Sequence, residues 1–279
     1  MKKRRMKGVK PMSFIGNLIV LAYAVVLTVP LYFAVITAFK TEQERVINPI
    51  GLPSSPSFIN FITAWTEGNL LVAAKNSIII SCGSTFLLLL NVILVSYCLN
   101  RIRDSKLGVA LYMLVLSSMF IPGVGGVTGL MLRRSLGLYN NLLGEIICNS
   151  IGITTGVFLV SGFLRTIPHD LEEAAMLDGA TDMQTCFKVI VPVIRPSLVT
   201  VGILSFTGTW NSALGPMLTL RDERLRTIPM ALLLNFTKEY SIEYTKMFAG
   251  VIITAIPLIV VYCKCQKYFV SALSGSVKG

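Results

Sequence analysis

The sequence predicts an all-α integral membrane protein, and its composition, its long uncharged runs and its placement of basic residues all favour that class. Of the 279 residues, 53% are hydrophobic and 14% are charged, whereas an ordinary soluble domain has about 25% charged residues. The mean hydropathy is +0.71. So few charges cannot cover a soluble globule, and we therefore expect lipid to surround most of the surface.

Six runs of the sequence contain no Lys, Arg, Asp, Glu or His and come close to the length of a membrane-spanning helix. About 20 apolar residues are needed to cross the hydrocarbon core. We interpret each run as one spanning helix and take its ends as the upper limit of that helix. The runs cover residues 12–39, 76–100, 107–132, 146–164, 196–220 and 247–263.

The first run follows a cluster of basic residues, as the apolar part of a secretory signal peptide does. Its apolar stretch is too long for a signal peptide, and no cleavage site of small residues closes it. We therefore interpret it as a retained helix. Six Lys and Arg precede this helix and three follow it before the second run, which predicts a cytoplasmic N-terminus.

Alternation of sides across six helices also predicts a cytoplasmic C-terminus. The predicted cytoplasmic segments contain fifteen Lys and Arg, and the outer segments contain ten, in agreement with the positive-inside rule. The chain is thus expected to consist of a basic cytoplasmic N-terminus (1–12), a six-helix transmembrane domain (13–270) with a cytoplasmic loop at 165–195, and a cytoplasmic tail (271–279). No separate soluble domain is predicted.

The cytoplasmic loop at 165–195 has the pattern of two short helices. Asp170 can accept hydrogen bonds from the first helical turn, and Glu173 can reach back to it as in a capping box, while Pro168 stops a helix that arrives from upstream. Gly179 supplies the left-handed residue that ends such a helix. The first helix is therefore predicted at 171–178.

A second capping box predicts the second helix of this loop. Thr181 and Gln184 have the required spacing, and the helix is expected to end before Pro192. The small side chains of Ala174 and Ala175 would let another backbone approach closely. The loop is interpreted either as a projecting segment that docks in a groove of another protein or as a surface turn between two capped helices.

The loop also resembles a known family motif. The segment from Glu173 to Ala180, Glu-Ala-Ala-Met-Leu-Asp-Gly-Ala, is similar to the EAA loop in the membrane subunits of binding-protein-dependent ABC importers, together with Phe187, Ile190, Pro192 and Pro196. Nearly the whole chain resembles the MalG-type permease of carbohydrate importers. The matching segments are Phe39-Lys40-Thr41, Asn76-Ser77, Thr209-Trp210-Asn211, Leu225 to Pro229, Ala249-Gly250 and the tail from Gln266 to Gly279.

This resemblance implies a type I importer bundle in a bacterial cell membrane, with both termini in the cytoplasm. The chain would form a heterodimer with a second permease, two ATPase subunits would dock on it, and an extracytoplasmic lipoprotein or periplasmic protein would deliver the sugar. ATP and magnesium would be bound by the ATPase subunits, no cofactor by this chain, and neither catalysis nor nucleic-acid binding is expected. The residues assigned to ATPase coupling are Asp170, Glu172, Glu173, Ala174, Ala175, Asp178, Gly179 and Ala180.

Polar and aromatic residues inside the runs are the candidates for contact with a sugar, because sugars are bound by hydrogen bonds and aromatic stacking. We assign the path to Asn91, Thr209, Trp210 and Asn211. Such residues also form hydrogen bonds between membrane helices, and Trp210 can equally anchor a helix end at the interface. A wider set of candidates adds Tyr97, Asn149, Thr154 and Thr155.

Other functions remain as alternatives. The importer could carry glycerol phosphate or another small polar solute instead of a sugar. A self-sufficient secondary transporter is disfavoured because the runs contain no ionisable residue, and an ATPase because the chain has no GxxxxGK[ST] loop. The chain has one histidine, His169, and six cysteines without a CxxC pair. This composition disfavours a metal site and an acid-base enzyme.

Overall fold

The computed structural model of the chain describes residues 14–120, 126–168, 170–238 and 241–275. This part is almost entirely helical, with one antiparallel pair of two-residue strands, and confirms the predicted all-α class. The helices of the first half are α1 (Phe14–Ala38), α2 (Glu42–Ile47), α3 (Ile59–Glu67), α4 (Leu70–Arg101), α5 (Lys106–Ser117), α6 (Gly126–Ser135), α7 (Leu142–Ser150) and α8 (Thr154–Leu164).

The second half of the chain begins with the short helices of the 165–195 loop and ends with a long helix. Its elements are α9 (Asp170–Leu177), α10 (Asp182–Gln184), a π-helix η1 (Thr185–Ile190), α11 (Val191–Val193), α12 (Arg195–Trp210), α13 (Leu214–Thr219), a 3-10 helix η2 (Glu223–Leu225), α14 (Ile228–Phe236), β1 (Thr237–Lys238), β2 (Ser241–Ile242) and α15 (Tyr244–Gly275).

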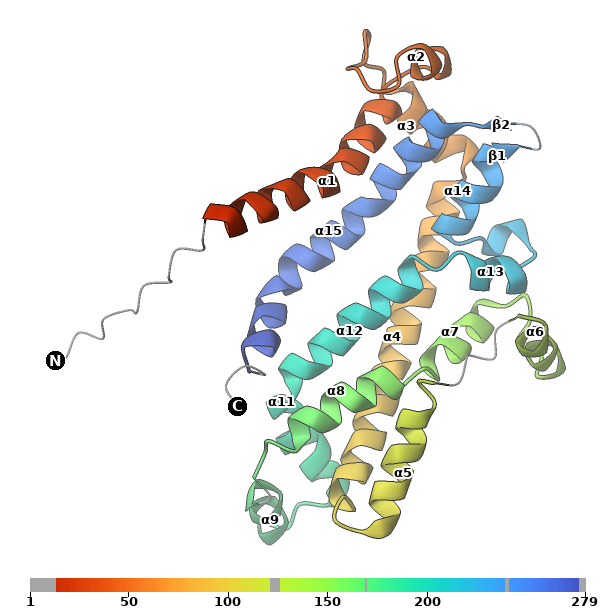
Figure 1. Ribbon diagram of the computed structural model, residues 1–279. Coiled ribbons are helices and arrows are strands. Elements are labelled where there is room, and N and C mark those ends of the chain that lie inside the picture. Colours follow the sequence, from red (N-terminus) through yellow and green to blue (C-terminus); the bar gives the residue numbers. More distant parts are fainter. Residues whose placement is uncertain (1–13, 121–125, 169, 239–240, 276–279) are drawn as a thin grey trace.

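The central element of the bundle is α4, against which α7, α8 and α12 pack (Figure 1). One apolar core lies where α4 meets α8 and α12 and includes Val92 and Val157. A second core lies near the start of α4, against α14 and α15, and includes Phe236. Near that start, the Asn76 side chain donates to the backbone carbonyls of residues 224 and 226, at 2.8 and 3.0 Å. Packing and hydrogen bonds thus hold both ends of α4.

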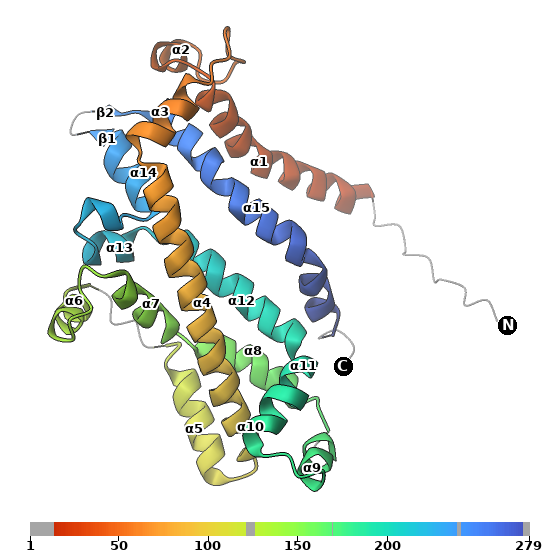
Figure 2. The same cartoon turned by 180° about the vertical axis from the view of Figure 1, so that it is seen from behind.

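Helix α1 leans away from this bundle and runs alongside α15 (Figures 1 and 2). Most of its large apolar side chains between Leu18 and Val35 are exposed. Burying these side chains requires lipid or another protein chain, because the rest of this chain covers only one side of the helix.

Three described helices are individually long and apolar enough to cross a membrane: Gly16–Ala38, Leu70–Arg101 and Tyr244–Lys264. Two bent helix pairs raise the number to five if each is one broken span. The first pair, Leu142–Ser150 with Thr154–Leu164, bends by 42°, and the second, Asp182–Val193 with Arg195–Trp210, bends by 81°. Several such helices in one chain are typical of a multi-pass membrane protein.

The predicted run at 107–132 is not one continuous helix in the described residues. Helix α5 ends at Ser117 after 12 residues, and part of the run, 121–125, lies outside them. Six crossings therefore stay a prediction, as do the sides of the membrane on which the termini lie. Residues 1–12 and 276–279 lie outside the described part.

Two other expectations about the spans are wrong. The runs at 76–100, 146–164 and 247–263 are not upper limits, because α4 begins at Leu70, α7 begins at Leu142 and α15 extends to Gly275. The runs at 146–164 and 196–220 are not single helices, because α7 ends at Ser150 before α8 begins, and α12 ends at Trp210 before the short α13. Hydropathy cannot show these breaks, since apolar residues continue through them.

Candidate functional site

The loop at 165–195 forms the two short helices expected from its capping residues. Asp170 is the first residue of α9 and not the residue before it; position 169, where a cap would lie, is outside the described residues. Gly179 has a φ of +81°, and nothing lies within 4 Å of the position that a Cβ would take. The glycine is therefore required by the left-handed backbone and not by lack of space.

The second capping box is confirmed. The Gln184 N–H donates to Thr181 Oγ1 at 3.4 Å, and the Thr181 N–H donates to Gln184 Oε1 at 3.0 Å. The expected end before Pro192 is wrong, because the helix continues through η1 and α11 to Val193. Pro192 stands just after the π-helix η1, where the ordinary helical hydrogen-bond pattern is already changed, and the helix ends one residue after it.

The residues assigned to coupling do not all face the same way. Glu173, Ala174 and Asp178 are exposed, whereas Glu172 is only 6% exposed. The Asn100 side chain, near the end of α4, donates to Glu172 Oε1 at 3.4 Å. Glu172 therefore fixes α9 to its own bundle, and the exposed face of α9 is left for a partner.

Within that loop, Ala175 and Ala180 are partly buried. The Ala180 N–H donates to the Ala175 carbonyl at 3.0 Å and closes the turn after α9. Leu177 is 89% exposed. A large apolar side chain at the end of a projecting helix is typical of a contact surface.

Arg101, which the sequence did not single out, contacts the 165–195 loop in the structure. It is the last residue of α4, and its guanidinium forms an ion pair with Asp182 of α10. Arg101 Nη2 also lies 3.5 Å from the sulfur of Met176 in α9. Together with Asn100, Arg101 links α4 to both short helices of the loop. Only its place in a basic loop between two runs could have drawn attention to it.

The assigned path residues are only partly brought together. Trp210 and Asn211 both line a cavity of about 330 Å³ between the end of α12, α14 and α15. Thr209 and Asn91 lie outside its wall. Asn91 Nδ2 donates instead to the Ser150 carbonyl of α7 at 3.3 Å. Asn91 thus forms a hydrogen bond between helices, which is the alternative to contact with a sugar.

Trp210 is also part of the apolar core. It is 3% exposed, and its ring stacks on Phe206 with centroids 5.6 Å apart. The rest of the cavity wall is mainly apolar, with Thr254 as a further hydroxyl. The wall thus presents an amide and a hydroxyl within a mainly apolar surface, and no charged side chain lines this cavity in the described residues.

The sequence also did not predict a buried ion pair between Glu145 and Arg133. Glu145 lies one residue before the run at 146–164 and was therefore placed outside the helix. The structure includes it in α7, where it is 2% exposed. Its carboxylate pairs with Arg133 of α6 and accepts a hydrogen bond from the Thr219 hydroxyl of α13. An acid held in this way links three helices, and its charge is balanced by Arg133.

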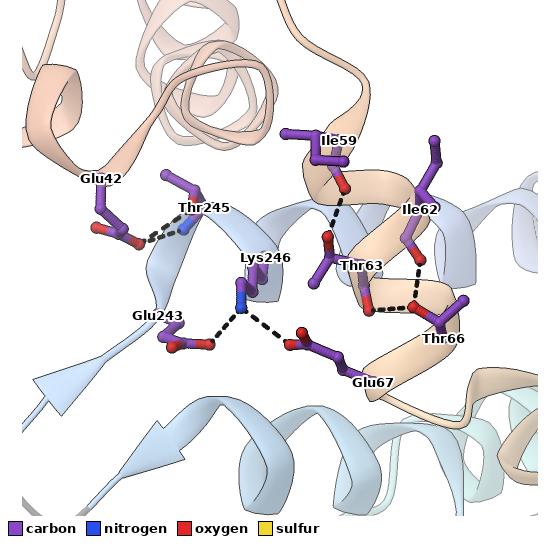
Figure 3. A network of polar contacts seen from close by, with 9 residues as sticks. All are labelled: Glu42, Ile59, Ile62, Thr63, Thr66, Glu67, Glu243, Thr245 and Lys246. Carbon is purple, nitrogen blue, oxygen red and sulfur yellow. Dashed lines mark hydrogen bonds and ion pairs between the residues drawn. The ribbon is translucent and has the colours of Figure 1, made fainter.

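A polar network connects α2, α3 and α15 at the end of the molecule opposite to α9 (Figures 1 and 3). Lys246 Nζ lies 2.9 Å from Glu67 and 3.1 Å from Glu243. Glu42 Oε1 accepts from the Thr245 N–H at 2.9 Å and from its hydroxyl at 3.1 Å. These contacts fix the start of α15 to α2 and α3.

The segment between α2 and α3 is also ordered by a carboxylate. Glu44 accepts hydrogen bonds from the Ser54 N–H at 2.5 Å and from its hydroxyl at 2.7 Å. These two donors favour the ionised form and hold the pKa of Glu44 below its ordinary value. The proline- and serine-rich segment is thus tied to α2.

Residues 6–272 match the model of the family described as "Binding-protein-dependent transport system inner membrane component". The chain is similar to the melibiose/raffinose/stachyose import permease protein MelC of Bacillus subtilis, with 30% identity over 100% of both chains. It is 29% identical to the diacetylchitobiose uptake system permease protein NgcG of Streptomyces coelicolor, over 93% of this chain and 87% of that protein.

A solved structure has the same fold. It is a crystal structure of a bacterial ABC transporter involved in the import of the acidic polysaccharide alginate. The match covers 91% of this chain and 95% of that chain, with a TM-score of 0.78 and 23% sequence identity. The match confirms the expected permease fold.

Proposed function

The chain belongs to the family of binding-protein-dependent transport system inner membrane components, and we propose that it is the permease through which an ATP-driven importer carries a sugar. It is a transport subunit and not an enzyme. The proposal of an oligosaccharide is supported by the relatives MelC and NgcG, whose names specify oligosaccharides. The mainly apolar cavity beside Trp210, with an amide and a hydroxyl in its wall, is compatible with such an uncharged cargo.

The observation that supports the coupling role best is the exposed face of α9. Glu173 and Leu177 point away from the bundle, while Glu172 is buried against α4. A helix fixed on one side and exposed on the other can pass a movement of its partner into the bundle. We propose that the partner is an ATPase subunit and that two such subunits bind ATP and magnesium.

The other partners are part of the same proposal. A second permease would cover the exposed apolar side of α1 and complete the pore. An extracytoplasmic binding protein, a lipoprotein or a periplasmic protein, would deliver the sugar at the end formed by α2, α3 and the β pair. Both termini and the 165–195 loop would then lie in the cytoplasm of a bacterial cell.

The test is uptake by liposomes that contain the full-length chain, its second permease and the ATPase, with the binding protein outside. ATP inside should drive accumulation of a labelled oligosaccharide, and an ATPase unable to hydrolyse ATP should abolish it. Uptake that persists without the ATPase would instead support a secondary transporter. Competition by glycerol phosphate, with no effect of oligosaccharides, would support the alternative cargo.

A further inference from the structure

Helices α4, α5 and α8 lie together at the end of the bundle that carries the loop at 165–195, here called the coupling loop (Figure 2). A cavity of about 280 Å³ is lined by residues of these three helices and of the turns that follow α4 and α8. α4 ends at Arg101, α5 begins at Lys106 and α8 ends at Leu164. Helix α4 and the α7–α8 pair are candidate membrane spans, so we place the cavity at their ends at the depth of lipid headgroups. It is separate from the cavity beside Trp210.

Two arginines line this cavity, and only one of them has an acidic partner, which is itself exposed. The Arg165 guanidinium carbon lies 4.8 Å from the centre of the Tyr112 ring, and among the described residues no carboxylate is within ion-pair distance of Arg165. Arg103 has only Asp104, at 3.7 Å, and the Asp104 side chain is 90% exposed. Two positive charges at one cavity favour an anionic ligand.

A buried hydroxyl in the same wall also lacks a partner. Ser161 of α8 is 5% exposed, and its Oγ has no hydrogen-bond partner. Buried polar atoms are normally paired. The unpaired hydroxyl adds a hydrogen-bonding group to this wall, and it is one of ten such side-chain atoms in the described residues.

The remaining wall is apolar. Leu99 of α4 is buried, while Val109 and Met113, one helical turn apart on α5, are exposed. A free inorganic anion would leave this surface uncovered. A ligand with both an anionic group and a hydrocarbon chain satisfies the two arginines and the apolar wall together.

We propose that this cavity binds an anionic phospholipid, with its phosphate between Arg103 and Arg165 and the beginning of an acyl chain against Val109 and Met113. Basic pockets between membrane helices recognise lipid headgroups in this way. The site goes beyond the proposed sugar import and does not depend on the identity of the cargo.

The cavity is directly connected to the coupling loop. Arg165 is the first residue of the loop, and Asn100 both lines the cavity and donates to Glu172 of α9. A bound headgroup would therefore steady the inner end of α4 and the attachment of α9. The lipid composition of the membrane would then influence how efficiently the ATPase drives transport.

The test is native mass spectrometry of the full-length chain, purified with phosphatidylglycerol and phosphatidylcholine in equal amounts. The wild-type chain should retain phosphatidylglycerol preferentially. The double variant Arg103→Gln/Arg165→Gln should retain about tenfold less, since each basic contact contributes to lipid binding. The matched control Lys106→Gln/Lys264→Gln removes the same charge from exposed residues outside the cavity and should retain phosphatidylglycerol as the wild type does.

A third variant tests the acyl chain. Met113→Trp fills the apolar wall without a change in charge and should also reduce retention, while inorganic phosphate should not displace the lipid. Displacement by phosphate, equal retention of both lipids, or equal loss in the control and in the double variant would overturn the proposal. Size-exclusion profiles of all variants should match the wild type, which separates lost binding from misfolding.

Discussion

The guanidinium of Arg101, the last residue of α4, forms an ion pair with the carboxylate of Asp182 at the start of α10. The two side chains are 31% and 69% exposed, so the pair contributes little to overall stability. Its importance is its position, because it joins the central helix of the bundle to the loop that is proposed to receive the movement of the ATPase. Loss of the pair should affect coupling more than folding.

The exchange of these two charges tests this connection. Arg101→Asp and Asp182→Arg should each reduce ATP-driven uptake about tenfold, and the double exchange should recover most of it, as expected for directly interacting residues. Lys106→Asp, at an exposed residue of the same end, is the control. If the double exchange is as impaired as the single variants, the pair does not transmit the movement.

The exposed side of α9 gives a second prediction. Glu173→Lys should leave membrane insertion and thermal stability unchanged, because exposed substitutions alter the free energy of unfolding by about 0.5 kcal/mol or less. It should reduce copurification of the ATPase, because it reverses a contact charge. Asp104→Lys makes the same change at another exposed residue and should bind the ATPase normally. Normal ATPase binding by the Glu173 variant would refute the docking role.

The turn after α9 gives a third prediction, through the backbone of Gly179. Leucine at φ +81° costs about 1 to 2 kcal/mol, so Gly179→Leu should displace α9 and uncouple ATP hydrolysis from uptake. Gly179→Asn is the matched variant, because asparagine tolerates left-handed backbone, and it should retain most transport. Equal transport by both variants would show that the left-handed turn is not needed.

The cavity beside Trp210 gives a fourth prediction, on the translocation path. Asn211→Ala removes an exposed amide from its wall and should lower the maximal uptake rate while the apparent affinity for sugar, set by the binding protein, stays constant. Trp210→Ala should do the same, with a loss of stability of about 3 to 5 kcal/mol because the ring is buried. Trp210→Phe keeps a buried aromatic ring but removes the indole, so it separates the effect on the uptake rate from the loss of stability. A change in affinity alone would indicate a recognition site instead.

The predicted orientation is tested by reporter fusions after Lys75 and after Arg195. The distribution of basic residues predicts that the first reporter lies outside and the second in the cytoplasm. Alkaline phosphatase should therefore be active at the first position and a fluorescent protein at the second. The same side for both fusions would contradict the six-span topology.

Local chemistry explains which features the sequence predicted. The box of Thr181 with Gln184 and the left-handed Gly179 depend on residues a few positions apart, and both are present. The ion pair of Arg101 with Asp182 joins residues far apart in the chain, and no local pattern shows it. The break after Trp210 was missed because hydropathy measures apolarity and not direction, and Glu145 because a charged residue ends a run even where the helix continues.

The length of α4 has a mechanical consequence. Its 32 residues extend over about 48 Å, well beyond a hydrocarbon layer of about 30 Å, so both ends can reach the aqueous boundary. One end holds the η2 region through Asn76, and the other holds the coupling loop through Asn100 and Arg101. The helix can therefore tilt as a rigid body about its middle, which is packed in the bundle. A tilt of about 5° about its midpoint would shift each end by about 2 Å in opposite directions, comparable to the helix shifts that switch other proteins.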